Sequence, residues 1–325
     1  MPGFTTHYIF GMKAYNDMPF TPLKHTIAKY RWLYQLGLQG PDMFFYNIPI
    51  LRHRDYRNVG SYMHEHKVNA FFECCLRRIG TIRSRQQQEE AISYLAGFIN
   101  HYIADSICHP YVYGRIGYPV DAPTSMHHGM HAHLENELDA ILLWKYKKKK
   151  PSEFNQTATI CLNGQEIQFI SHFLASCINE TYYPITYRNN FQVTPAMVHR
   201  SIWALRFGCR TLSDKNGKKK FGIAQVESIF VNHPVASAKM VTDSVTDYRS
   251  SCNLNHEAWS NPWDPTRVST ASFVDLFHET LDKCSRVYAL LNSAVTDNVP
   301  LDKQDLSPLL AELGNESYHS GLPVD

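Results

Sequence analysis

The sequence predicts a mostly α-helical protein, a helical bundle that carries a small β-hairpin insertion. Three observations support this fold class. Apolar residues recur at helical spacing over most of the first 215 residues, Gly and Pro fall where these segments end, and one segment has the pattern of a hairpin. We find no internal repeat and no low-complexity linker. We therefore expect one domain of residues 1–325, with a core of residues 1–215 and a C-terminal extension of residues 216–325.

The helices are expected, in chain order, from their apolar spacing and their end signals. Residues 22–38 stop before Gly40-Pro41, and residues 64–80 end in two arginines and Gly80. Residues 86–109 begin polar, become apolar and are expected to stop at Pro110, because proline cannot continue the helical hydrogen bonds. The remaining helices are expected at residues 127–146, 168–182, 193–211 and 271–292.

Residues 157–170 are the segment with the hairpin pattern. Two runs rich in β-forming residues, TATICL and QEIQFI, flank Asn163-Gly164. Because Asn-Gly suits a two-residue turn between antiparallel strands, we expect a β-hairpin here.

Composition excludes several classes of protein. Apolar residues make up 44% of the chain, charged residues 19%, and the net charge is only +2, so no nucleic-acid partner is strongly expected. The basic runs at Lys145–Lys150 and 215–220 are interpreted as a solvated helix end and a solvated loop. No run of 18 apolar residues predicts a transmembrane helix. The start MPGF lacks the pattern of a signal peptide and the eight cysteines form no CxxC pair, so we expect a cytoplasmic protein with reduced thiols.

Histidine is unusually frequent, with 17 residues, and several are spaced like metal ligands. The segment HYIADSICHP places His101, Asp105 and His109 four residues apart. Residues four apart on an α-helix lie about 40° apart on one face. We therefore expect His101 and Asp105 to reach one metal ion, and His109, one turn further on, to serve a second.

The segment HAHLENELD repeats this interval twice. One pair is His131 and Glu135, and the other is His133 and Glu137, rotated by about 200°. Leucines flank the line of the first pair. We therefore expect His131 and Glu135 to be the inner ligands, with Asp139 supporting them, and the second pair to be solvated.

Three further side chains complete the candidate set. Asp42 follows a Gly-Pro break, His64 begins an expected helix, and His7 lies in a short N-terminal segment. His66 and His53 are alternatives to His64. Imidazoles mixed with carboxylates, without thiolates, suit zinc most readily, with iron or manganese as alternatives.

The order of these motifs resembles the zinc-dependent phospholipase C family of bacteria, and the wider group that includes the single-strand nucleases of fungi and plants. The resemblance spans about 135 residues and is most specific in its last two motifs. The matching segments are HYIFG, GPDMFFY, MHEHKVNAFF, NHYIADSICHPY and HAHLENELD. The later segment NHEAWSNPWDP looks like the tail of uncharacterised intracellular members.

This resemblance implies a mostly helical fold around a cluster of zinc ions. The implied ligands are Asp42, His64, His101 and Asp105 for the first ion, His109, His131 and Glu135 for the second, and His7 with a bridging Asp105 for the third. It also implies that Asp42 acts as general base. Secreted members use an N-terminal tryptophan for the third ion and separate the positions of Asp105 and His109 by an interval of six. This chain begins MPGF and has an interval of four, so two or three ions are expected.

We therefore expect a zinc-dependent hydrolase of a phosphoester, in first place a phosphodiester, that uses a metal-activated water. The expected substrate is a small phosphoester or a phospholipid. One alternative is a non-catalytic, metal-stabilised binding protein. Another is a di-iron oxidase, which is less favoured because those helical sites use Glu-x-x-His at i,i+3.

Overall fold

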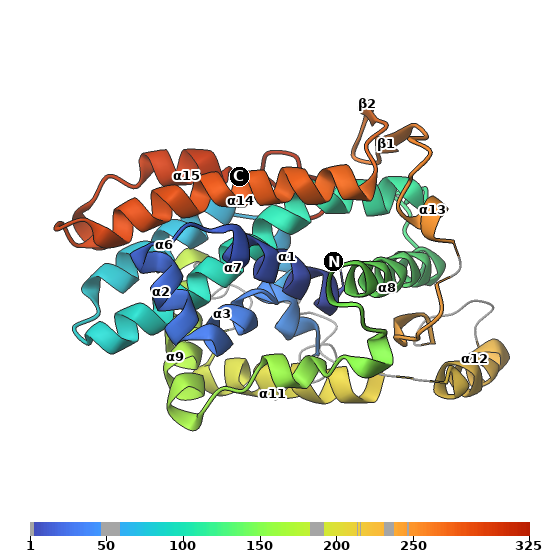
Figure 1. Ribbon diagram of the computed structural model, residues 1–325, viewed down its shortest axis with the longest axis horizontal. Coiled ribbons are helices and arrows are strands. Elements are labelled where there is room, and N and C mark those ends of the chain that lie inside the picture. The colour runs from blue at the N-terminus through green and yellow to red at the C-terminus, as the bar shows by residue number, and fades with distance from the viewer. Residues whose placement is uncertain are drawn as a thin grey trace.

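The computed structural model of the protein describes residues 3–46, 59–182, 192–212, 214, 216–230, 237–245 and 247–325. In these ranges the protein is mostly helical, with one two-stranded antiparallel sheet, which confirms the predicted fold class (Figure 1). The helices of at least seven residues are α1 (Phe4–Asp17), α2 (Pro22–Lys29), α3 (Arg31–Gly37), η1 (Gly40–Tyr46), α5 (Val59–Glu65), α6 (Val68–Thr81), α7 (Arg85–Arg115), α8 (Ser125–Lys147), α9 (Gly164–Tyr182), α11 (Pro195–Leu212), α12 (Lys218–Phe230), α14 (Phe273–Thr296) and α15 (Ser307–Leu313).

The long helix α7 forms the centre of the bundle. It contacts α1, α2, α3 and α14 along its length, and its residues from Ser93 to Ser106 are all buried. In Figure 1, α14 and α15 run along one edge of the molecule, and α11 lies along the opposite edge. A helix that is apolar on all sides is expected at such a central position, because every face can be buried.

The core has two neighbouring parts. The larger part gathers apolar side chains from α2, α3, α6, the first half of α7 and α9. The smaller part joins α1, α8 and the second half of α7 to the start of α14, where Phe10 stacks on Phe277 with ring centroids 4.4 Å apart. The two parts meet along α7, so packing fixes the position of this helix from both ends.

The hairpin predicted at residues 157–170 is wrong. Residues 156–159 form a 3-10 turn and α9 begins at Gly164. The backbone N–H of Glu166 donates to Asn163 Oδ1 at 2.9 Å, while the backbone N–H of Asn163 donates to Glu166 Oε2 at 2.8 Å. This reciprocal capping box starts a helix, so the side chain of Asn163 serves a helix instead of a turn.

The observed hairpin lies about 100 residues later along the chain. Strand β1 (Trp259–Asn261) pairs with β2 (Asp264–Ser269), and the register shifts between Ser260 and Asn261. The sheet packs against the second half of α7.

Three helix boundaries also differ from the prediction. The helix expected at residues 22–38 divides at Tyr30 into α2 and α3. The helix expected at residues 64–80 is replaced by α5 and α6, which are separated where Lys67 adopts a left-handed φ of 49°.

Pro110 does not end α7, which continues to Arg115. Tyr111 and Val112 are buried there, and Tyr111 donates a hydrogen bond to the Ser251 carbonyl at 2.7 Å. This packing offsets the helical hydrogen bond that the proline removes.

Candidate metal centre

Asp105 lies at the middle of a cluster of buried histidines. Its Oδ1 is 3.1 Å from His7 Nε2, and its Oδ2 is 3.2 Å from His101 Nε2 and 3.6 Å from His64 Nε2. All four side chains have no exposed surface. One carboxylate therefore contacts imidazoles from α7, α1 and α5.

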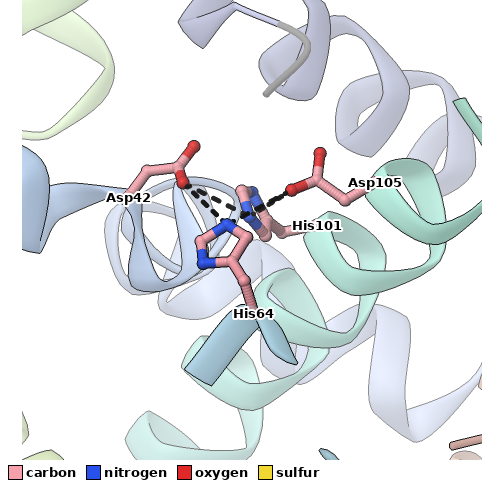
Figure 2. Close-up of side chains that lie close together, drawn as sticks. All are labelled: Asp42, His64, His101 and Asp105. Carbon is pink, nitrogen blue, oxygen red and sulfur yellow. Dashed lines mark ion pairs between the residues drawn. The ribbon is translucent and has the colours of Figure 1, made fainter. Parts of the chain in front are cut away.

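The first group of candidate ligands consists of Asp42, His64, His101 and Asp105. Each offers one ligand atom, and these atoms all lie within 4.8 Å of one another. Figure 2 shows the four side chains converging from η1, α5 and α7, with Asp42 Oδ1 3.3 Å from His64 Nε2 and 3.9 Å from His101 Nε2. The sequence interval of four on α7 brings His101 and Asp105 to the same face, as predicted.

The Gly-Pro-Asp segment fits this group because of its glycine. Gly40 has a φ of +47°, and a Cβ atom there would lie 2.2 Å from the His101 ring. Glycine is therefore required both by the backbone conformation and by the close approach of His101. The 3-10 turn that follows then carries Asp42 to the cluster.

The second group consists of His109, His131 and Glu135, from α7 and α8. Glu135 Oε1 lies 2.6 Å from His131 Nε2 and 3.6 Å from His109 Nε2. His109 Nδ1 is also 3.6 Å from Asp105 Oδ1, so the second group adjoins the first through neighbouring turns of α7.

His7 is held beside both groups by the first turn of α1. Its ring stacks on that of His101 with centroids 4.0 Å apart. Asp139 accepts hydrogen bonds from the backbone N–H groups of Thr5 at 3.1 Å and Thr6 at 2.7 Å. A carboxylate at a helix N-terminus satisfies N–H groups that the helix itself leaves unpaired. Asp139 therefore positions His7 through the backbone of α1.

Backbone carbonyls orient three of the histidines. His64 Nδ1 donates to Gly60 O at 2.6 Å, His101 Nδ1 to Leu38 O at 3.1 Å, and His109 Nδ1 to Tyr318 O at 2.7 Å. A carbonyl can only accept, so these contacts place the proton on Nδ1 and leave the Nε2 lone pair facing the cluster. This second hydrogen bond is the arrangement that metal-ligating histidines usually have.

Several buried atoms at the centre have no hydrogen-bond partner. They are both ring nitrogens of His7, Oδ1 of Asp42, Nε2 of His64, His101 and His109, and both carboxylate oxygens of Asp105. Buried polar atoms are rarely left in this state, because each loses its hydration without a replacement. A cation among these atoms would satisfy them together. The nitrogen and oxygen donors of both groups fit zinc.

The ionisation of the cluster also fits a bound cation. Burial and the charge of His101 lower the pKa of His7 to about 4. Burial opposes ionisation of His64, but the nearby carboxylates of Asp105 and Asp42 raise its pKa to about 9. Burial opposes the charge on Asp105 too, yet His101 and His7 hold its pKa well below the ordinary value. Asp105 therefore remains charged, and without a metal a proton on His64 compensates for it.

A segment near the C-terminus completes the enclosure and was missed by sequence reasoning. The Tyr318 N–H donates to His64 O at 2.9 Å, while its carbonyl accepts from His109. The ring of His319 stacks on that of His64 with centroids 4.9 Å apart and an angle of 13°. No spacing rule connects these residues to the motifs, because they lie more than 170 positions after the last of them. An isolated histidine in a polar tail was the only signal.

The other candidates from the sequence have different outcomes. Among the described residues His66 belongs to neither group, and His53 lies outside the described residues. His133 is half-exposed, as expected, but the expectation that Glu137 is solvated is wrong. The Glu137 carboxylate is buried and accepts a hydrogen bond from Ser251 Oγ, which replaces the water that it loses.

A helical bundle that collects buried imidazoles and carboxylates around one aspartate defines a class of metal-binding proteins with clustered ions. The chain belongs to the zinc-dependent phospholipase C family, whose model matches residues 6–186, more than half of its length. This membership implies a zinc-dependent hydrolase of phosphoric esters. No curated protein and no solved structure matches the chain.

None of the helices in the described ranges is long and apolar enough to cross a bilayer.

Proposed function

We propose that the protein hydrolyses a phosphoester, in first place a phosphodiester, at a zinc centre formed by the two groups. The observation that carries this proposal is the set of fully buried Nε2 and carboxylate atoms around Asp105 that lack hydrogen-bond partners. A merely structural polar network would pair these atoms with donors, because unpaired buried groups cost stability.

Each ligand has a place in this proposal. Asp42, His64, His101 and Asp105 would hold one zinc ion, and His109, His131 and Glu135 a second. His7 and the bridging Asp105 would hold a third. Bound there, zinc would supply an acidified water and neutralise charge on the phosphate oxygens.

Asp42 is proposed as the general base. It lies at the edge of the first group, and its Oδ1 has no hydrogen-bond donor of its own. A carboxylate in this position can accept a proton from the attacking water or orient that water toward phosphorus. Asp105 lies beside four imidazoles and would instead bridge zinc ions.

A cavity of about 690 Å³ supports a substrate with an apolar substituent. It begins at Glu135 of the second group and extends between α8 and α11. Aromatic side chains, among them Phe4, Phe45 and Trp203, line it, and Arg200 is a cation in its wall. A phosphoester bound at the metal centre would have room here for an aromatic or aliphatic group, as ligand pockets of mainly apolar lining provide.

The test combines metal analysis with turnover of a chromogenic phosphodiester and a chromogenic phosphomonoester. We expect two or three zinc ions per chain and zinc-dependent hydrolysis that prefers the diester. Asp105→Ala should lose zinc and activity together, and Asp42→Asn should reduce kcat by at least 100-fold while retaining most of the metal. Stoichiometric zinc without turnover of either substrate would favour the metal-stabilised binding protein instead.

Helix α8 offers a matched control. His131 and His133 lie two residues apart, but only His131 belongs to a candidate group, and His133 is half-exposed. We expect His131→Ala to lose about one zinc ion per chain, and His133→Ala to lose none. Equal metal contents for the two variants would contradict the proposed second group.

A further inference from the structure

Helix α11 has a buried apolar face and an outer face of unusual composition. Val198, Ile202 and Leu205 point into the core. On the outer side, Trp203 is 64% exposed and Phe207 is 54% exposed, and their rings stack 5.4 Å apart at an angle of 8°. Soluble proteins rarely keep two large aromatic side chains together in water, because burying them elsewhere would be favourable.

Basic side chains flank this aromatic pair. Arg200, Arg206 and Arg210 share the outer face, since at 100° per residue they and the two aromatic residues fall within about 120° of the helix circumference. No aspartate or glutamate occurs in α11. Within the described part of the chain, none of the three arginines forms a hydrogen bond or an ion pair. The outer face therefore presents uncompensated positive charge around two exposed rings.

This face continues into the cavity that reaches the metal centre. Arg200, Trp203 and Phe207 line that cavity as well as facing outward, and Glu135 lines its inner end. In Figure 1, α11 forms one long edge of the molecule and has no described helix on its outer side. Whatever covers the outer face also covers the mouth of the cavity.

We propose that α11 lies flat on the surface of a bilayer that contains anionic phospholipid. A helix of this length spans about 27 Å and would place its arginines at the level of the lipid phosphates. The two aromatic rings would enter the boundary between headgroups and acyl chains, where amphipathic rings are favoured. An acidic protein or a nucleic acid would satisfy the arginines, but only an interface that is both anionic and apolar also removes both rings from water.

The inference goes beyond the proposed function and does not require the metals to perform chemistry. Helix α11 also follows the residues that match the family, which end at 186, so the matched segment does not contain this face. Docking through α11 would fix the orientation of the protein on the membrane, with the mouth of the cavity against the lipid surface.

Vesicle binding tests the proposal with the full-length protein. We expect co-sedimentation with vesicles of phosphatidylcholine plus phosphatidylserine, and at least tenfold weaker binding to vesicles of phosphatidylcholine alone. Raising the salt concentration from 50 mM to 500 mM should weaken binding, because it screens the arginines. Equal binding to both kinds of vesicle, or no binding to either, would overturn the proposal.

Two double variants test whether vesicle binding depends on the outer face of α11 or only on the net charge of the protein. Arg206→Gln/Arg210→Gln removes two charges that have no described partner and lie outside the cavity lining. Each arginine near an anionic surface contributes on the order of fivefold, so we expect roughly 30-fold weaker vesicle binding and unchanged hydrolysis of a soluble substrate. The control Arg267→Gln/Arg286→Gln removes the same charge from β2 and α14, and should bind vesicles like the wild type. Equal losses for the two double variants would refute a docking face on α11.

Tryptophan fluorescence tests the insertion of the rings. Anionic vesicles should shift the emission of the wild type to shorter wavelength, and Trp203→Phe should abolish most of this shift while retaining binding. Trp203→Ser/Phe207→Ser should weaken vesicle binding even at low salt. Binding that depends on the arginines but leaves Trp203 emission unchanged would show a purely electrostatic contact and overturn the proposal. A protein that dimerises through α11 without vesicles, and loses the dimer in Trp203→Ser, would overturn it too.

Discussion

Replacing Gly321 by alanine should disturb the metal centre from outside the motifs that form it. Gly321 has a φ of +60°, and an added Cβ atom would lie 2.6 Å from the carbonyl oxygen of Ser106 and 3.2 Å from Pro110. Both residues belong to α7 and lie within one turn of His109. The alanine would therefore push the segment that contains Tyr318 away from α7, and Tyr318 supplies the carbonyl that orients His109.

The loss of stability expected for Gly321→Ala has two parts, and a loss of zinc affinity accompanies it. A left-handed backbone costs an alanine about 1–2 kcal/mol relative to glycine. Overlap with the backbone of a buried helix adds about 1–3 kcal/mol, because either the segment or the helix must move. Losing an orienting hydrogen bond of a metal-ligating histidine typically weakens metal affinity by about 10- to 100-fold. Gly321→Ala should therefore lower stability by a few kcal/mol and zinc affinity by at least tenfold.

Gly117→Ala is a control that has the same backbone cost without the overlap with a helix. Gly117 has nearly the same φ, +61°, but nothing lies within 4 Å of an added Cβ atom. Zinc affinity is measured by chelator competition at a temperature where both variants are folded, and stability by thermal unfolding of the metal-free proteins. Gly321→Ala should be the less stable variant, and it alone should bind zinc more weakly. Equal zinc affinities in the two variants would refute the orienting role of the Tyr318 carbonyl.

The remaining predictions concern pH, helix packing and the cap of α1. In metal-free protein, His7 contributes stability above pH 6.5, and this contribution is lost as the pH falls toward its pKa of about 4. His64 contributes stability below pH 6.5, and this contribution is lost as the pH rises toward its pKa of about 9. The melting temperature should therefore peak near pH 6.5, and a steady rise to pH 9 would contradict this. Gly97→Ala should lower the free energy of unfolding by about 1–3 kcal/mol, because its Cβ would lie 2.1 Å from a backbone oxygen of α3. Gly222→Ala has open space around its Cβ and should raise the free energy of unfolding by about 0.5–1 kcal/mol, and denaturant unfolding measures both changes. Asp139→Ala leaves two N–H groups of α1 unpaired and should lower the free energy of unfolding by about 1–3 kcal/mol. If His7 holds an ion, metal analysis of this variant should also show a lower zinc content.

The candidate site could be predicted from the sequence because most of its information is local. Helical geometry alone places His101, Asp105 and His109 on one face, and the structure gathers them with His131 and Glu135 from a second helix. The pattern of leucines was also enough to favour the pair on α8 that lies beside His109. Local spacing could not position His64, which lies in the last turn of α5 and not at the start of a helix.

The errors arise where a distant or competing interaction decides the structure. Asn163-Gly164 suits a turn, but Glu166 completes a capping box with Asn163, and the helix that follows buries an apolar face. Pro110 normally ends a helix, but packing of the residues after it outweighs the lost hydrogen bond. The contribution of Tyr318 is a backbone carbonyl, which no residue type encodes.

The spread of the centre along the chain has a consequence for protein synthesis. Its groups extend from His7 to Tyr318, so a ribosome must synthesise the chain as far as residue 318 before His109 acquires its orienting carbonyl. At 5–20 residues per second, about 10–40 s separate the synthesis of α7 from that of this last part. During that interval the nascent chain holds the histidines of α7 without their full set of partners. Chains that include Tyr318 should therefore bind the metal tightly, and chains that end before Tyr318 should release zinc to a chelator.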